Sequence, residues 1–157
     1  MTEEMKRGAA GVRCADSAGA PAAAEGRAAA PDEKSIALAF LGDAVYEQYI
    51  RERLVRSGRC RGRADLMHRQ AASFVRASAQ AEVIRALLPE LSEEEQRTAL
   101  RARNHRIATK PKNADAATYK WATGFEALLG SLKLAGREER LRELMDRAWE
   151  LLDRGES

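Results

Sequence analysis

The sequence predicts an all-α protein, a single bundle of about five or six helices without a sheet. Apolar residues recur at helical spacing through most of the chain after residue 31, and no segment shows a sustained alternation of apolar and polar residues. Capping residues, glycines and prolines separate the periodic segments. The chain has 157 residues, which is the length of one ordinary domain.

The first 31 residues are expected to lie outside the bundle. They are rich in Ala, Gly and Pro, and they offer too little large apolar surface to offset the entropy of ordering. They also lack the apolar core of a secretory signal and carry acids that transit peptides tend to avoid. We therefore expect a disordered tail over residues 1–31 and a folded domain over residues 32–157.

Two helical stretches open the folded domain. Asp32 or Ser35 can cap a first helix, which stops near Gly58. A second stretch, residues 64–88, is either continuous or broken near Phe74, and it ends before a proline.

Three further helices follow. Ser92 and Glu95 have the S-x-x-E spacing of a capping box, which predicts the start of the next helix. A proline-containing loop comes after it, and a helix over residues 115–135 then ends at Gly136. The last helix covers about residues 138–153 and has one apolar stripe.

The cysteine content and hydropathy favour a cytoplasmic protein. Cys14 and Cys60 are the only cysteines, so the chain has neither a disulfide framework nor the ligands of a zinc site. No apolar run approaches the roughly 18 to 20 residues that a membrane span needs, so we expect no membrane partner.

The first helix carries acids among apolar residues. Two opposite sides of it are apolar, which predicts that protein surrounds the helix nearly all round. Asp43 and Glu47 fall inside one apolar arc, where a carboxylate requires a cation or hydrogen-bond donors to offset lost hydration. Gly42 destabilises a helix by about 1 kcal/mol relative to Ala, which predicts a close approach to the backbone. The arcs contain Ile36, Phe40, Ile50 and Leu54 on one side and Leu38, Leu41 and Val45 on the other.

A second acid, Glu126, lies at the margin of the apolar stripe of the helix over residues 115–135, between Gly124 and Gly130. Asp43 and Glu126 together could hold a divalent ion. On periodicity alone, a buried salt bridge or a capping role is the more frequent explanation for each acid, and Glu47 is expected to pair with Arg51 at i,i+4.

The segments around these acids resemble a known family. Residues 39–45, AFLGDAV, look like the signature helix of ribonuclease III enzymes, and residues 125–130, FEALLG, look like their second acidic motif. Further similar stretches are GDAVYEQYIRERL, LMHRQAASFVRASAQA and RARNHRIATKPKNADAATYKWATGFEALLG. The resemblance covers about residues 34–153 and is nearest to the Mini-III branch, which lacks a double-stranded RNA-binding domain.

The resemblance implies the fold and a reduced active site. It implies a ribonuclease III endonuclease-domain-like helical bundle, with Asp43 and Glu126 as metal ligands and catalytic carboxylates. Ala39 stands where the family's first Glu would be and Thr123 where its second Asp would be, which is the pattern of the Mini-III branch. The implied chemistry is Mg²⁺-dependent hydrolysis of double-stranded RNA that leaves a 5′-phosphate and a 3′-hydroxyl.

Two basic windows are candidates for RNA contact. One contains Arg51, Arg53, Arg56, Arg59, Arg61 and Arg63; the other contains Arg97, Arg101, Arg103, Arg106, Lys110 and Lys112. A solvated helix face is the alternative for both, and it is stronger for the first. We assign RNA binding to Arg101, Arg103, Arg106, Lys110, Lys112 and Asn113.

The resemblance also implies partners. Ribonuclease III domains form two-fold dimers through the signature helix, so Phe40 is expected at the interface of a homodimer. The Mini-III branch points to maturation of the 23S ribosomal RNA precursor, with a ribosomal protein as a possible helper. Two alternatives stay open: a catalytically silent RNA-binding or ribosome-associated protein of the same fold, and a helical interaction module unrelated to RNA.

Overall fold

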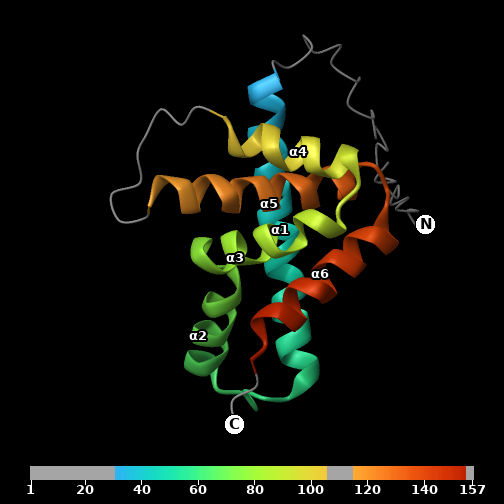
Figure 1. Ribbon diagram of the computed structural model, residues 1–157. Coiled ribbons are helices and arrows are strands. Elements are labelled where there is room, and N and C mark those ends of the chain that lie inside the picture. The colour runs from blue at the N-terminus through green and yellow to red at the C-terminus, as the bar shows by residue number, and fades with distance from the viewer. Residues whose placement is uncertain (1–30, 106–114, 155–157) are drawn as a thin grey trace, which may run out of the picture.

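The computed structural model of the protein describes residues 31–105 and 115–154. These residues form six α-helices and one short 3₁₀ helix and contain no strand, which confirms the predicted all-α fold (Figure 1). The elements are α1 (Pro31–Ser57), α2 (Ala64–Val75), α3 (Ala77–Leu87), η1 (Leu88–Glu90), α4 (Glu93–Arg103), α5 (Ala116–Leu134) and α6 (Glu138–Leu152). Residues 1–30 of the tail expected over residues 1–31 lie outside the described residues, and Pro31 is the first residue of α1.

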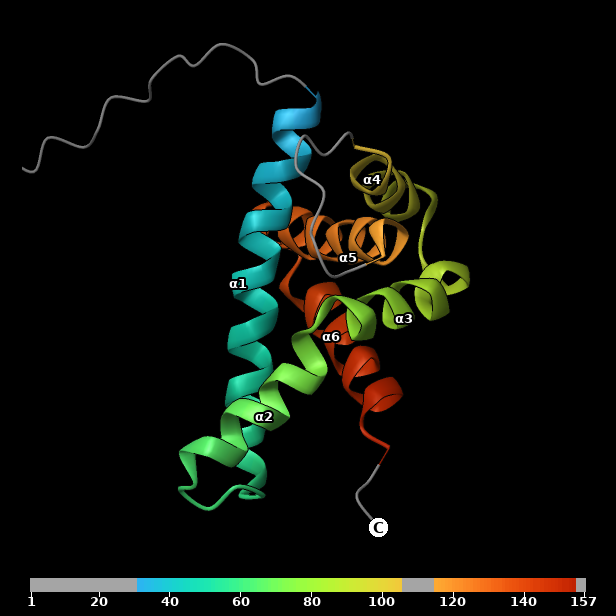
Figure 2. The same ribbon diagram turned by 90° about the vertical axis from the view of Figure 1, so that its left-hand side faces the viewer.

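Helix α1 runs along the whole molecule, and α5 crosses it (Figures 1 and 2). Helices α3 and α4 pack along opposite sides of α5, while α2 and α6 pack near the C-terminal half of α1. The core lies where these layers meet. Its centre holds Tyr46 of α1 and Phe125 of α5, whose ring centroids are 5.1 Å apart in an edge-to-face arrangement.

Local signals place most helix ends where the sequence predicts them. The capping box opens α4: Glu95 N–H donates to Ser92 Oγ (3.2 Å), and Ser92 N–H donates to Glu95 Oε2 (2.9 Å). Gly136 follows α5 with φ +68°, a conformation that glycine adopts without strain. The break in the second stretch lies at Arg76, whose extended backbone (ψ 151°) separates α2 from α3.

The surroundings of α1 differ from the helical-wheel expectation. Ile50 and Leu54 are buried, but Ile36 is 52 % exposed and Phe40 is 83 % exposed. Val55 on the same helix is 68 % exposed. The expectation that protein surrounds α1 nearly all round is therefore wrong for a single copy of the chain, since the apolar arc around Phe40 has no partner among the described residues.

No helix in the two described ranges combines the length and the apolar character needed to cross a membrane.

Candidate active site

The backbones of α1 and α5 touch at two glycines. A Cβ atom on Gly42 would lie 1.7 Å from the backbone oxygen of Glu126, and one on Gly130 would lie 2.0 Å from the backbone oxygen of Leu38. Neither obstacle is a flexible side chain, so only glycine fits at these positions. The close approach predicted from Gly42 is the crossing of α1 and α5, and it sets the residue after Gly42, Asp43, beside Glu126.

The pKa values of both carboxylates are raised. Burial, and then the negative charge of Asp43, raise the pKa of Glu126 to about 7. Partial loss of water, and then the charge of Glu47, raise the pKa of Asp43 above its ordinary value. Asp43 nevertheless lies at the surface. The expectation from helical periodicity that this acid lies within a buried apolar arc is therefore wrong. Glu126 is partly buried, whereas Asp43 is exposed to solvent.

Glu47 has the partner expected from its spacing. Arg51 Nε donates to Glu47 Oε1 at 3.0 Å, one helical turn along α1. This pair lies on the surface of the helix and shares its side with Asp43. Glu47 thus belongs to an ordinary i,i+4 ion pair.

Ala39 and Thr123, the two positions at which the resemblance would place a further acid, carry no carboxylate. Ala39 is buried in a small apolar cluster with Leu38, Ala102 and Ala127. Thr123 donates its hydroxyl to the backbone oxygen of Tyr119 at 3.0 Å, within α5. Across residues 31–105 and 115–154 no group of three or more His, Cys, Asp and Glu side chains lies close enough to share a metal ion. Among the described residues, the candidate site therefore contains two acids, Asp43 and Glu126.

This donor set fits Mg²⁺. The ion prefers oxygen ligands, keeps several waters and is commonly held by one or two carboxylates together with substrate phosphates. Burial first, and then the negative charge of Asp43, raise the pKa of Glu126, and a cation bound by both carboxylates would offset these two effects. Asp43 and Glu126 would hold such an ion between α1 and α5.

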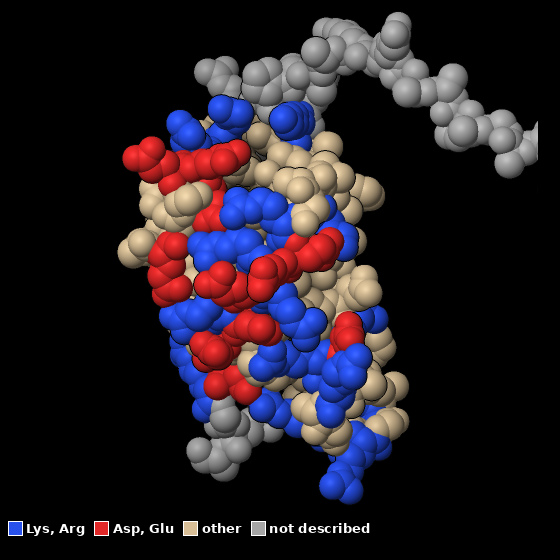
Figure 3. Space-filling model, turned by 90° about the vertical axis from the view of Figure 1, so that its right-hand side faces the viewer, with Lys and Arg blue, Asp and Glu red and all other residues tan. Residues whose placement is uncertain are grey.

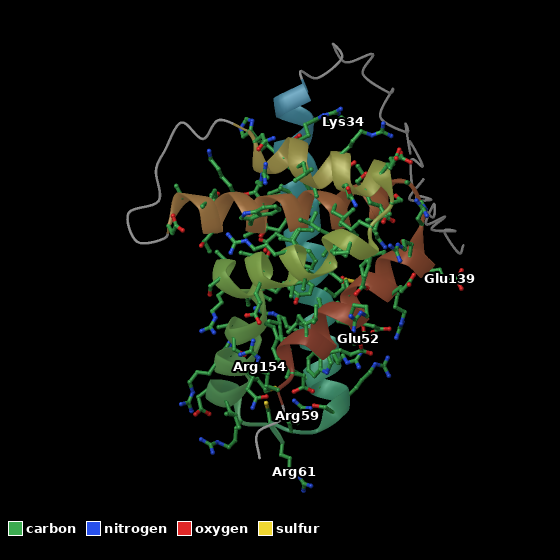
Figure 4. All side chains as sticks on the ribbon, in the orientation of Figure 1. Lys34, Glu52, Arg59, Arg61, Glu139 and Arg154 are labelled. Atoms are coloured by element: carbon green, nitrogen blue, oxygen red, sulfur yellow. The ribbon has the colours of Figure 1, made fainter. Side chains whose placement is uncertain are left out.

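The first basic window is mostly committed to ion pairs within the fold. Guanidinium nitrogens of four of its arginines lie 2.5 to 3.1 Å from carboxylate oxygens on α1, α2 or α6, and Arg59 pairs with Asp153 just after α6. Figure 4 shows Arg59 and Arg61 at the end of the molecule opposite Lys34. The four are Arg51, Arg53, Arg56 and Arg63, and these pairs favour the alternative of a structural, solvated face for this window.

The second window differs. Arg97 and Arg101 form no ion pair with any described residue, and Arg101 is exposed. Arg103 lies with its guanidinium carbon 4.4 Å from the centroid of the Trp121 ring and donates to Asn104 Oδ1. Its remaining donors stay available. The other assigned RNA contacts, Arg106, Lys110, Lys112 and Asn113, lie outside the described residues.

Charge on the α6 side is balanced instead. Figure 3 shows that Lys and Arg alternate there with Asp and Glu over the face that lies to the right in Figure 1. Arg140 Nε donates to Glu95 Oε1 at 2.9 Å, and Arg147 pairs with Glu90 at 2.8 Å. Several arginines of this face are therefore already paired with carboxylates of the fold.

Two side chains of α3 make interactions that the sequence did not predict. Gln80 is buried and lowers the pKa of Glu126 against the larger effect of burial, and the guanidinium carbon of Arg85 lies 5.5 Å from the Trp121 ring centroid. Gln80 precedes Val83 and Ile84 by three and four residues, so a polar residue on the core stripe of α3 was the available signal. The sequence contains no signal for the contact of Arg85 with Trp121, because this contact joins two separate helices.

A helical fold with two acids at a glycine-mediated helix crossing defines a recognisable class. The chain matches the Ribonuclease III domain over residues 36–137, a range that contains both acids, and it belongs to the ribonuclease III family. Within this family of RNA endonucleases it belongs with the Mini-ribonucleases 3, which confirms the resemblance found in the sequence.

The similarity covers most of each partner. The chain is 46 % identical over 121 residues to Mini-ribonuclease 3 of Symbiobacterium thermophilum, covering 77 % of this chain and 92 % of the relative. It is 42 % identical over 122 residues to the Mini-ribonuclease 3 of Brevibacillus brevis, covering 78 % and 89 %. A crystal structure of a protein from Fusobacterium nucleatum superposes with a TM-score of 0.65 at 29 % identity, over 71 % of this chain and 88 % of that one.

Proposed function

We propose that the protein is a Mg²⁺-dependent endoribonuclease that cleaves double-stranded RNA, with Asp43 and Glu126 as its metal ligands and catalytic carboxylates. The observation that carries this proposal is the backbone contact between Gly42 and Glu126, which brings together two acids from helices that are far apart in the sequence. A bundle that needed these acids only for stability would gain nothing from setting two like charges side by side.

The residues perform separable tasks. Asp43 faces the outside, where a phosphate can approach, while Glu126 is anchored in the fold and fixes the position of the centre. Mg²⁺ bound there would supply an activated water for in-line attack on the phosphodiester, leaving a 5′-phosphate and a 3′-hydroxyl. Deprotonation of Glu126 near neutral pH makes ion binding dependent on pH.

The basic residues of α4 support a duplex substrate. A-form RNA is recognised mainly through phosphates and 2′-hydroxyls, and Arg101 and Arg103 present guanidinium groups without acidic partners among the described residues. We extend this surface to Arg106, Lys110, Lys112 and Asn113. By family analogy, the substrate is the precursor of 23S ribosomal RNA in the cytoplasm, with a ribosomal protein as a candidate helper.

We also propose a homodimer through α1. One centre cuts one strand, so a two-fold dimer would place one centre on each strand of a duplex. The exposed apolar side chains of Ile36, Phe40 and Val55 offer a surface for the second copy.

Light scattering should give a dimer for the wild type and a monomer for Phe40→Asp. Leu134→Asp, which changes an exposed apolar residue at the end of α5, should remain dimeric. A wild-type monomer with full activity would overturn the dimer.

A cleavage assay tests the activity itself. The purified protein is incubated with a duplex RNA and with either of its single strands, in Mg²⁺ and then in EDTA. Cuts in the duplex that require Mg²⁺ support the enzyme. Salt-sensitive binding without cuts would instead support the silent RNA-binding protein, which the absence of carboxylates at Ala39 and Thr123 keeps as the second candidate.

A further inference from the structure

Gln80 of α3 is a polar side chain in the core. It is only 2 % exposed, on the same side of the helix as the buried Val83, Ile84 and Leu87. A buried amide is stable only if its hydrogen-bonding groups find partners, because each unsatisfied group costs about 1–3 kcal/mol. A residue in this place therefore needs a specific explanation.

The amide nitrogen of Gln80 joins two features. Gln80 Nε2 donates to the backbone oxygen of Val75 at 2.8 Å. Val75 is the last residue of α2, and its carbonyl has no helical acceptor role because the chain is extended at Arg76. The side chain also interacts with the Glu126 carboxylate, and this interaction lowers the pKa of Glu126 against the larger opposing effect of burial. Gln80 thus interacts both with the end of α2 and with the partly buried Glu126 of α5.

The amide oxygen of Gln80 remains an orphan. The bond to Val75 fixes which end of the amide is the donor, and the buried Oε1 has no hydrogen-bond partner. It is a pure acceptor next to a carboxylate, so neither Asp43 nor Glu126 can satisfy it in the charged form. When both acids are charged, as ion binding requires, a water molecule is the simplest donor for such an atom.

We propose that Gln80 is a positioning residue of the carboxylate pair: its amide nitrogen orients Glu126, and its Oε1 accepts a hydrogen bond from a water that Mg²⁺ carries. The inference rests on the proposed function. Residues that orient metal ligands from behind typically contribute 10- to 100-fold to metal affinity or activity. Because Gln80 is buried, it does not itself contact the RNA and would act through Glu126.

The chain offers a matched control. Gln96 of α4 is also a partly buried glutamine, and its Nε2 donates to the backbone oxygens of Leu88 and Leu91 at 2.9 and 3.2 Å. It satisfies helix-end carbonyls as Gln80 does, but no bond connects it to either acid. Gln80→Met and Gln96→Met each remove one such amide and keep the length of the side chain.

The decisive comparison measures Mn²⁺ binding to the RNA-free protein, together with kcat and KM for duplex RNA. Gln80→Met should weaken Mn²⁺ binding about 10- to 100-fold and lower kcat in step, with KM changed by less than about twofold. Gln96→Met should leave all three near wild type. If the two variants behave alike, Gln80 is structural only and the inference is overturned.

A measurement on the wild type covers the case in which Gln80→Met does not fold. The side-chain NH₂ resonances of Gln80 and Gln96 can be followed in NMR spectra as Mg²⁺ is added. The inference predicts movement for Gln80 and none for Gln96, and a stationary Gln80 resonance would contradict it. Activity that survives in Asp43→Asn and Glu126→Gln would instead overturn the proposed function, whatever Gln80 does.

Discussion

Replacing Glu126 with Gln should make the protein more stable at pH 8. Folding raises the pKa of this carboxyl from an ordinary 4.5 to about 7, because burial and then the charge of Asp43 oppose ionisation. The neutral acid therefore stabilises the folded state fully below pH 4.5, and this contribution is lost as the pH rises through about 7. A neutral glutamine avoids the loss.

The size of the effect follows from the shift. Each pKa unit corresponds to about 1.36 kcal/mol, so the shift of Glu126 gives at most about 3 kcal/mol in the free energy of unfolding. Glu126→Gln should gain up to this amount at pH 8 and little at pH 5. Since Mg²⁺ restores a counter-charge to the wild type alone, adding it should reduce the difference at pH 8.

Urea unfolding at pH 5, 6, 7 and 8, without divalent ions and then with Mg²⁺, measures this difference. Glu47→Gln is the matched control, because Glu47 lies on the surface in an ion pair with Arg51. It should change stability by less than about 0.5 kcal/mol at every pH. A gain for Glu126→Gln that is equal at pH 5 and pH 8, or absent at both, would refute the reasoning.

Three further changes test the fold and the RNA surface. Gly42→Ala should destabilise the protein by about 2 kcal/mol or more in thermal or urea unfolding, since its Cβ would meet the backbone of α5, although helix propensity alone predicts a gain of about 1 kcal/mol. Its control is Ala44→Gly on the exposed part of the same helix, which should follow propensity and lose about 1 kcal/mol; a stable Gly42→Ala would contradict the tight crossing. Ser92→Ala should lower stability by about 1 kcal/mol through loss of the α4 cap, without changing kcat. Arg103→Ala should weaken binding of duplex RNA and reduce the magnitude of the salt-dependence slope by about 1, and an unchanged slope would remove Arg103 from the RNA surface.

The helices were predictable because their ends are local. The S-x-x-E box at Ser92 and the glycine after α5 each act within a few residues of themselves, so the sequence contains the whole signal. The break between α2 and α3 was expected only in its neighbourhood. It lies at Arg76, where no glycine or proline forces the extended backbone.

The site was predictable only through its motifs. Gly42 indicated a close contact but not which helix makes it. Helical periodicity does not distinguish an apolar arc that packs inside one chain from one that packs against a second chain, as at Phe40. The ion pairs of Arg53 with Asp146 and of Arg59 with Asp153 join residues more than 90 positions apart, so they had no sequence signal. The role of Gln80 depends on three helices at once.

The most direct test of the central claim compares single-turnover cleavage and RNA binding for Asp43→Asn, Glu126→Gln and the control Glu47→Gln. The first two should bind duplex RNA about as tightly as the wild type and cleave it at least about a hundredfold more slowly in Mg²⁺, while Glu47→Gln cleaves at close to the wild-type rate. Cleavage at the wild-type rate by either Asp43→Asn or Glu126→Gln would contradict the assignment of this pair as the catalytic metal centre.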